Sequence, residues 1–182
     1  TSDHFQELFL RNVPFLDVRA ELEFEKGHFP TSHNLPILTN EERLAVGICF
    51  KEKGQEEAVK LGHSLVEGDL KEQRIKAWCE FATTHNNTHL HCWRGGLRSN
   101  FAHQWMKDAG VEIQKIDGGF KALRRVIINQ IDDTAIQVPI IRIGGKTGTC
   151  KTVLVNSIEF STDLEGHANH RGSSFGRRVS GV

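Results

Sequence analysis

The stretch His91-Cys92-Trp93-Arg94-Gly95-Gly96-Leu97-Arg98-Ser99 is the most informative part of this chain. Residues 88–90 before it predict a short strand, and residues 100–106 after it predict a helix. The cysteine would then lie at the end of a strand, in a loop whose backbone N–H groups converge on its sulfur. Two arginines and the N-terminus of the helix would favour the thiolate, which is the nucleophilic form of cysteine.

The same loop is suited to bind an anion such as a phosphate, a sulfate or a persulfide, because its N–H groups and arginines are positive. A buried structural cysteine followed by a helix cap is the alternative interpretation. Two glycines and two arginines around one cysteine favour the reactive site over that alternative.

Strands alternate with helices on both sides of this loop, and this order predicts a parallel α/β sheet flanked by helices. Ligands of such sheets bind beyond the carboxyl ends of the strands, where Cys92 would lie. Thr39 and Glu42 have the spacing of a helix capping box. The expected strands are 13–19, 33–36, 88–92 and 111–116. The expected helices begin at Ala20 and Thr39 and cover 55–66, 70–82, 100–110 and 120–128.

A second domain is expected after a linker at residues 132–134. Residues 138–143 predict a strand, and the glycine-rich segment that follows resembles the phosphate-binding pattern G-x-x-x-x-G-K-[ST]. Cys150 stands where that pattern has its second glycine, so a side chain would lie in the path of a phosphate. A glycine-rich turn into a helix is the alternative. The candidate phosphate-binding residues are Gly145, Gly148, Lys151 and Thr152.

We therefore expect a complete α/β domain in residues 1–132 and the first part of a P-loop domain in residues 138–182. A P-loop domain needs several more strands and helices to close its sheet.

Composition excludes several classes of protein. The 23 basic and 23 acidic residues cancel, which gives no overall electrostatic attraction to nucleic acid. No apolar run approaches the roughly 18 residues that span a bilayer, and no basic-plus-apolar signal segment is recognisable. The four cysteines have no C-x-x-C spacing, and the ten histidines are scattered, so we expect neither a disulfide framework nor a metal site. We expect a cytoplasmic protein with no tightly bound cofactor and no membrane association.

Several motifs resemble known families. Residues 16–19, 23–30 and 33–36 are similar to the N-terminal fingerprint of rhodanese domains, and the Cys92 loop lies where that family carries its sulfur-accepting cysteine. Residues 45–51, 92–99, 117–124 and 163–176 resemble, in the same order, segments of tRNA 2-selenouridine synthases.

The resemblance implies a rhodanese domain followed by a P-loop domain. It also implies an enzyme that replaces the sulfur of 2-thiouridine at the wobble position of tRNA with selenium. Selenophosphate would be the selenium donor, and geranyl diphosphate would supply an S-geranyl intermediate. Cys92 would be the nucleophile that handles the chalcogen.

The remaining residues of the loop would form an anion cradle around Cys92. Arg98 would point into the loop, Arg94 would meet phosphate or selenophosphate, and Trp93 would pack on the flank or stack on a base. Asp17 and Arg19 would support the loop as a structural ion pair. The cradle residues are Trp93, Arg94, Gly95, Gly96, Leu97, Arg98 and Ser99.

Two other enzyme classes use the same residues. His91-Cys92-x5-Arg98-Ser99 also matches the loop of cysteine phosphatases, in which Cys92 would attack phosphorus and Arg98 would bind the phosphoryl oxygens. A plain rhodanese sulfurtransferase would move sulfane sulfur from thiosulfate through Cys92. A non-catalytic rhodanese-fold binding module is a third class, and the intact cysteine loop argues against it.

Overall fold

The computed structural model describes residues 2–137, 139–146 and 148–168. The chain divides into two compact units, Thr1–Asp132 and Asp133–Val182, and each is described separately. No helix in these described ranges is long and apolar enough to cross a membrane.

The first unit is built on a four-stranded sheet with the order β2-β1-β3-β4, in which every neighbouring pair is parallel. The expected parallel α/β fold is therefore confirmed. The paired strands are shorter than the sequence predicts, and β2 begins one residue earlier and ends two residues earlier than the predicted segment 33–36. Their bounds are β1 Phe15–Asp17, β2 Ser32–Asn34, β3 His89–His91 and β4 Gln114–Lys115.

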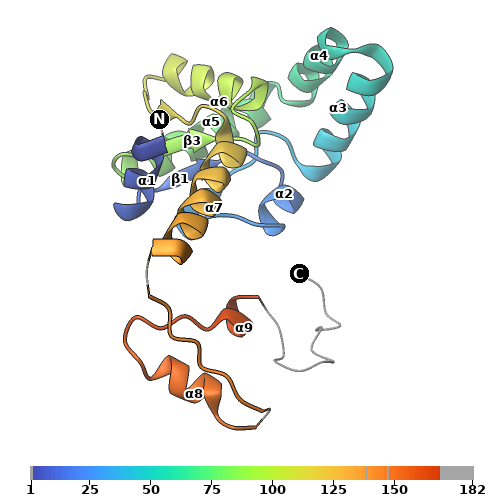
Figure 1. The fold of residues 1–182 in the computed structure, drawn as a ribbon. Helices are drawn as coiled ribbons and strands as arrows, with labels where there is room; N and C mark the ends of the chain where they lie inside the picture. Colours follow the sequence, from blue (N-terminus) through green and yellow to red (C-terminus); the bar gives the residue numbers. More distant parts are fainter. Residues whose placement is uncertain (1, 138, 147, 169–182) are drawn as a thin grey trace. The chain divides into compact units, whose positions relative to one another are not determined.

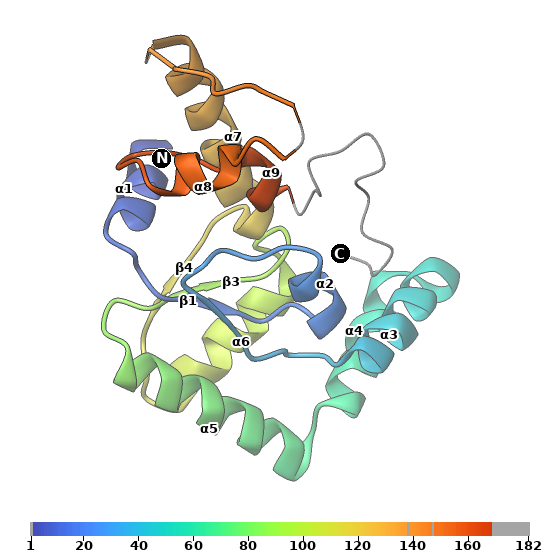
Figure 2. The same cartoon turned by 90° about the horizontal axis from the view of Figure 1, so that it is seen from below.

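Helices cover both faces of this sheet (Figure 1), and the view from below shows the two layers separately (Figure 2). One core joins Leu16 and Leu90 of the sheet to Trp78 and Met106. The opposite core joins Phe15 to residues such as Leu8 and Leu123. The helices involved are α5 Gly68–Thr84 and α6 Leu97–Asp108 on the first face, and α1 Ser2–Leu10 and α7 Gly119–Gln137 on the second.

A helical hairpin of α3 (Asn40–Lys53) and α4 (Gln55–Leu65) extends from one end of the sheet (Figure 1). The expected capping box is confirmed: the Glu42 N–H donates to Thr39 Oγ1 over 3.3 Å, and the Thr39 N–H donates to the Glu42 carboxylate over 2.8 Å. A short helix, α2 (Glu21–Glu25), follows β1.

The boundary between the two units falls within the predicted linker at residues 132–134, but these residues are helical and continue helix α7. Nothing in the segment stops a helix before Pro139, and a proline disfavours helical geometry in the residue before it.

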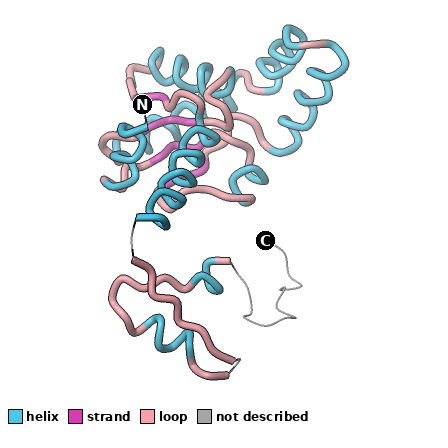
Figure 3. Tube along the Cα trace, in the orientation of Figure 1, coloured by secondary structure: helices cyan, strands magenta, loops and turns pink. Residues whose placement is uncertain are grey.

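The second unit contains the short helices α8 (Lys151–Asn156) and α9 (Leu164–His167), joined by loops (Figure 3). The strand predicted at 138–143 is wrong for residues 139–143, which pair with no other strand in the described ranges. A strand needs a hydrogen-bonded neighbour, and Ile141 is 91% exposed rather than packed. Residue 138 and the family-like segment beyond residue 168 lie outside the described residues.

Candidate active site

Cys92 lies directly after β3, at the carboxyl edge of the parallel sheet, and its loop leads into α6. The side chain is buried, with 3% of its surface exposed. Its thiol donates to Ser99 Oγ over 3.2 Å, and the Ser99 hydroxyl donates to the Gly96 carbonyl over 3.0 Å. The sulfur thus faces a hydroxyl that can turn its hydrogen toward a thiolate.

The surroundings of Cys92 lower the pKa of its thiol. Burial alone would raise that pKa, because it disfavours the charged form. Hydrogen bonds from the Ser99 side chain and from the backbone N–H groups of Arg94 and Ser99 act in the opposite direction, as does the charge of Arg98. Together these outweigh burial, so the loop favours the nucleophilic thiolate.

Because the pKa of Cys92 lies below its ordinary value of 9.0, we expect alkylation of this residue to persist to lower pH than that of an ordinary cysteine and to fall as pH drops through the lowered pKa. Ser99→Ala removes the strongest of the lowering contacts and should shift the alkylation profile to higher pH. The expected decrease in rate at pH 7 is about threefold to tenfold.

Iodoacetamide labelling from pH 5 to 10, with mass spectrometry of the peptide that contains Cys92, measures this shift. Ser157→Ala, at an exposed serine whose hydroxyl donates to the Leu154 carbonyl over 2.8 Å, is the matched control. An unchanged profile in Ser99→Ala would contradict this account of the thiolate.

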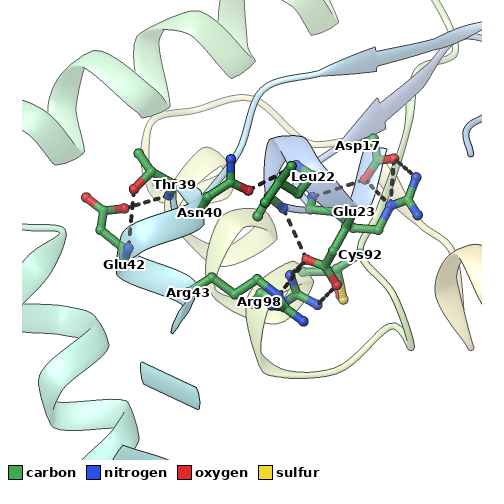
Figure 4. A network of polar contacts seen from close by, with 12 residues as sticks. Asp17, Leu22, Glu23, Thr39, Asn40, Glu42, Arg43, Cys92 and Arg98 are labelled. Atoms are coloured by element: carbon green, nitrogen blue, oxygen red, sulfur yellow. Dashed lines mark hydrogen bonds and ion pairs between the residues drawn. The ribbon is translucent and has the colours of Figure 1, made fainter. Parts of the chain in front are cut away.

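Arg98 reaches an acidic partner that the sequence did not suggest (Figure 4). Its Nη1 lies 2.5 Å from the Glu23 carboxylate, which also accepts from Arg43 Nε over 3.0 Å. Burial would raise the pKa of Glu23, but the two arginines lower it, so the carboxylate stays charged. Glu23 also accepts from the Ala20 N–H at the start of α2. Its pair with Arg98 therefore links this helix to the Cys92 loop.

Asp17 and Arg19 form an ion pair with both side chains completely buried. The Arg19 Nη2 lies 2.6 Å from Asp17 Oδ2 and donates to the Gly27 carbonyl over 2.9 Å. The guanidinium also lies 3.9 Å from the centre of the Phe120 ring. No ligand can reach these groups directly, so the pair supports the carboxyl edge of the sheet.

His91 precedes the nucleophile and is completely buried. Its Nδ1 lies 3.7 Å from Asp17 Oδ1, and neither ring nitrogen has a hydrogen-bond partner among the described residues. Burial lowers the pKa of His91, the charge of Asp17 raises it, and the charge of Arg19 lowers it, with a net decrease. The imidazole is therefore neutral at physiological pH.

The other cradle residues differ in their surroundings. The Trp93 ring stacks on Phe120 with 5.4 Å between ring centres and keeps 37% of its surface exposed. Arg94 is exposed and has no ion pair among the parts of the chain that are described. Trp93 therefore packs on the flank of the loop, as one of the two sequence-based alternatives has it, and Arg94 remains available to an anion.

A second turn, Gly118-Gly119-Phe120, closes the back of the Cys92 loop and was missed as part of the site. The Phe120 N–H donates to the Cys92 carbonyl over 2.8 Å, and the Lys121 N–H donates to the Trp93 carbonyl over 3.1 Å. Gly119 has a positive φ of 59°, and a Cβ at this position would clash with the Cys92 carbonyl. The sequence D-G-G-F contains the signal, because two consecutive glycines permit such a close approach.

Gly119→Ala is therefore expected to destabilise the first unit by roughly 2 kcal/mol or more, since it combines backbone strain with a backbone clash. Gly110→Ala separates the two causes, because Gly110 has a φ of +84° but open space around its Cβ. It should cost only about 1 kcal/mol. Urea denaturation followed by circular dichroism measures both changes, and equal losses would show that the close approach is unimportant.

The candidate phosphate loop lies in the second unit. Lys151 Nζ donates to the Lys146 carbonyl over 2.9 Å, and Thr149 Oγ1 donates to the same carbonyl over 2.8 Å. Cys150 has a φ of 55°, in the left-handed region that favours glycine. Gly145 and Gly148 flank position 147, which lies outside the described residues, and Thr152 lies in the first turn of α8.

No cluster of three or more His, Cys, Asp or Glu side chains within the described ranges is arranged to hold a metal ion. The chemistry that this arrangement supports is that of a buried, activated thiolate beside exposed arginine.

Comparison with known families matches both parts of the chain. The profile of the rhodanese-like domain matches residues 2–125. That of the tRNA 2-selenouridine synthase AAA domain matches residues 138–181.

Curated relatives are similar over nearly the whole chain. The tRNA 2-selenouridine synthase of Photobacterium profundum is 51% identical over 176 residues, which cover 97% of this chain and 48% of that protein. The tRNA 2-selenouridine synthase of Pseudomonas fluorescens (strain Pf-5) is 48% identical over 177 residues, which cover 97% of this chain and 49% of that protein. The chain thus spans about half the length of the curated relatives it matches.

One solved structure shares the fold of the first unit. It is the N-terminal domain of a protein from Clostridium difficile 630 whose name describes ATP/GTP binding. The two are 31% identical with a TM-score of 0.56, and the match covers 64% of this chain and 90% of that one.

Proposed function

Since the chain belongs to the tRNA 2-selenouridine synthase family, we propose that it takes part in replacing sulfur by selenium in the wobble 2-thiouridine of tRNA. The substrates are tRNA, selenophosphate as the selenium donor and geranyl diphosphate for the S-geranyl intermediate. No tightly bound cofactor is required by this scheme.

The observation that carries the proposal is the buried Cys92 with a lowered pKa at the carboxyl edge of the sheet. Such a thiolate is a strong nucleophile, and it can take the outer atom of a sulfane-type donor when that donor's leaving group departs with the electron pair of the broken bond. The backbone N–H groups from Arg94 to Ser99 would stabilise negative charge on the outer chalcogen.

Arg94 supports the anionic part of the scheme. It is exposed beside Cys92 and lacks an ion pair within the described part of the chain, so it can meet the phosphate group of selenophosphate. The positive charge of Arg98 acts on the Cys92 sulfur, and the ion pair with Glu23 holds the Arg98 guanidinium in place.

The test is nucleoside mass spectrometry of 2-thiouridine tRNA incubated with selenophosphate, geranyl diphosphate and the chain, in wild-type and Cys92→Ala forms. Selenouridine from the wild type alone supports the proposal. An S-geranyl product without selenouridine would assign this chain to the first step only. The absence of both products, from the chain and from a version that carries the remaining half of a relative, would refute it.

A plain sulfurtransferase is the second candidate. It is favoured because the first unit alone contains Cys92, with its lowered pKa, and the whole loop around it. The thiolate would attack the outer sulfur of thiosulfate, the S–S bond would break, and sulfite would leave with the electron pair. Rapid thiosulfate turnover together with no change in tRNA would favour this activity.

A further inference from the structure

We propose that the hollow between α3, α4 and α6 binds a short isoprenoid chain that carries an anionic diphosphate head. The inference rests on the proposed function and deepens it, because it gives a place to the prenyl group of that scheme. It is argued from the surface that this hollow presents.

The hollow has a volume of about 470 Å³ and is lined mainly by apolar side chains of the helical hairpin and of α6. This lies in the range of roughly 300–1,000 Å³ that is typical of small-molecule sites. The lining includes Val46 and Val59 from the hairpin, and Phe101 and Trp105 from α6.

Helix α3 packs Val46 against the first core but leaves much of its apolar surface exposed. None of its 14 residues is buried, and Leu44, Ile48 and Phe50, which line the hollow, are 62%, 48% and 54% exposed. Opposite them, Leu97 is 43% exposed at the start of α6. Large apolar side chains that gather around a concave surface indicate a binding site rather than ordinary surface.

The charges around the hollow select an anionic ligand. Arg43, Lys51 and Arg98 line it, and no aspartate or glutamate does so among the described residues. Arg43 and Arg98 share the single carboxylate of Glu23 behind the lining, so the three cations and this one carboxylate leave a net positive charge. Since the chain as a whole carries equal numbers of acidic and basic residues, this local bias is specific to the site. An apolar chain with a diphosphate head matches both the walls and the basic side chains.

The hollow is continuous with the active-site loop. Leu97 and Arg98 belong to both, and the charge of Arg98 acts on Cys92. Figure 4 shows Arg43 and Arg98 at the carboxylate of Glu23. A diphosphate held by these arginines would place the first carbon of the prenyl chain on the loop side of the hollow.

Gly47 offers a direct test, because it lines the hollow and a Cβ at this position would meet no atom within 4 Å. Gly47→Leu fills the space while improving helix propensity, so the hairpin should fold. Gly47→Ala is the matched control that gives the helix the same benefit with little added volume. Lys51→Gln removes one of the basic groups alone.

Isothermal titration calorimetry of the chain with geranyl diphosphate measures the effect, with pyrophosphate and an S-geranyl-2-thiouridine nucleoside as separate probes. We expect Gly47→Leu to weaken geranyl diphosphate at least about tenfold and Gly47→Ala less than about threefold. Lys51→Gln should weaken geranyl diphosphate but not the nucleoside. Tight binding of the nucleoside alone would assign the hollow to the tRNA-borne prenyl group.

Equal affinity of geranyl diphosphate for wild type and Gly47→Leu, or no binding of either prenyl probe, would overturn the inference. Cys92→Ser must bind like wild type, because binding in the hollow needs no thiolate. If Gly47→Leu forms selenouridine as fast as the wild type does, the proposed site is refuted and the proposed function still stands. If Gly47→Leu weakens the binding of geranyl diphosphate but the chain forms no product on tRNA, the site is supported and the proposed function is refuted.

Discussion

Replacing Cys92 by serine is expected to reduce both selenouridine formation and thiosulfate turnover by on the order of a thousandfold or more. A serine hydroxyl stays protonated at neutral pH and cannot take the role that we propose for the Cys92 thiolate. The fold should be unaffected, because serine occupies a similar volume and keeps a hydrogen bond to Ser99. Steady-state rates measured beside thermal unfolding curves separate the two effects.

Cys79→Ser is the matched control for this substitution. Burial raises the pKa of the Cys79 thiol, so this cysteine is not activated, and it lies on α5 away from the loop. We expect its rates to remain near those of the wild type. A Cys92→Ser variant that keeps substantial turnover would remove Cys92 from the mechanism.

The largest loss of stability is expected from Asp17→Ala, at about 3–5 kcal/mol, because it leaves the buried Arg19 without its carboxylate. Chemical denaturation of the first unit, read by tryptophan fluorescence, gives the free energy of unfolding. Glu7→Ala, which breaks the exposed Glu7–Arg11 pair, should cost less than about 1 kcal/mol.

A double variant tests the cause. If the loss in Asp17→Ala comes from the uncompensated charge of Arg19, then Asp17→Leu combined with Arg19→Met should recover much of the stability. A double variant as unstable as Asp17→Ala would show instead that the shape and hydrogen bonds of the pair matter more than its charge.

The sequence predicted the elements whose signals are local. The parallel sheet, the strand before Cys92, the helix after it and the Thr39 capping box are all present. The strand, the helix and the cap each depend on neighbouring residues, and the parallel sheet was inferred from the alternating order of strands and helices.

The errors occurred where an element depends on distant contacts. Helix α1 was missed, although Phe5, Leu8 and Phe9 have helical spacing and pack into the second core. The strand expected from residue 138 has an apolar sequence, but no neighbouring strand pairs with residues 139–143. The expected linker coincides with the boundary between the two units, but its two aspartates continue a helix that is already established.

The candidate site was anticipated only in part for the same reason. The position of Cys92 follows from its own loop, but Glu23 reaches Arg98 from 75 residues away in sequence. The contact of Gly119 with the loop backbone likewise joins two separate motifs. Both residues lie in segments that resemble the family, yet nothing in a single sequence assigns them to Cys92.

The tie between the Cys92 loop and the Gly118-Gly119-Phe120 turn has a consequence for protein engineering. Moving residues 91–99 alone onto another parallel α/β scaffold would leave the carbonyls of Cys92 and Trp93 without their donors. A working transplant has to carry the turn as well, held at the same separation by a neighbouring strand. The candidate site thus consists of two segments, the Cys92 loop and the turn, and it can be transferred only to a sheet that brings both together.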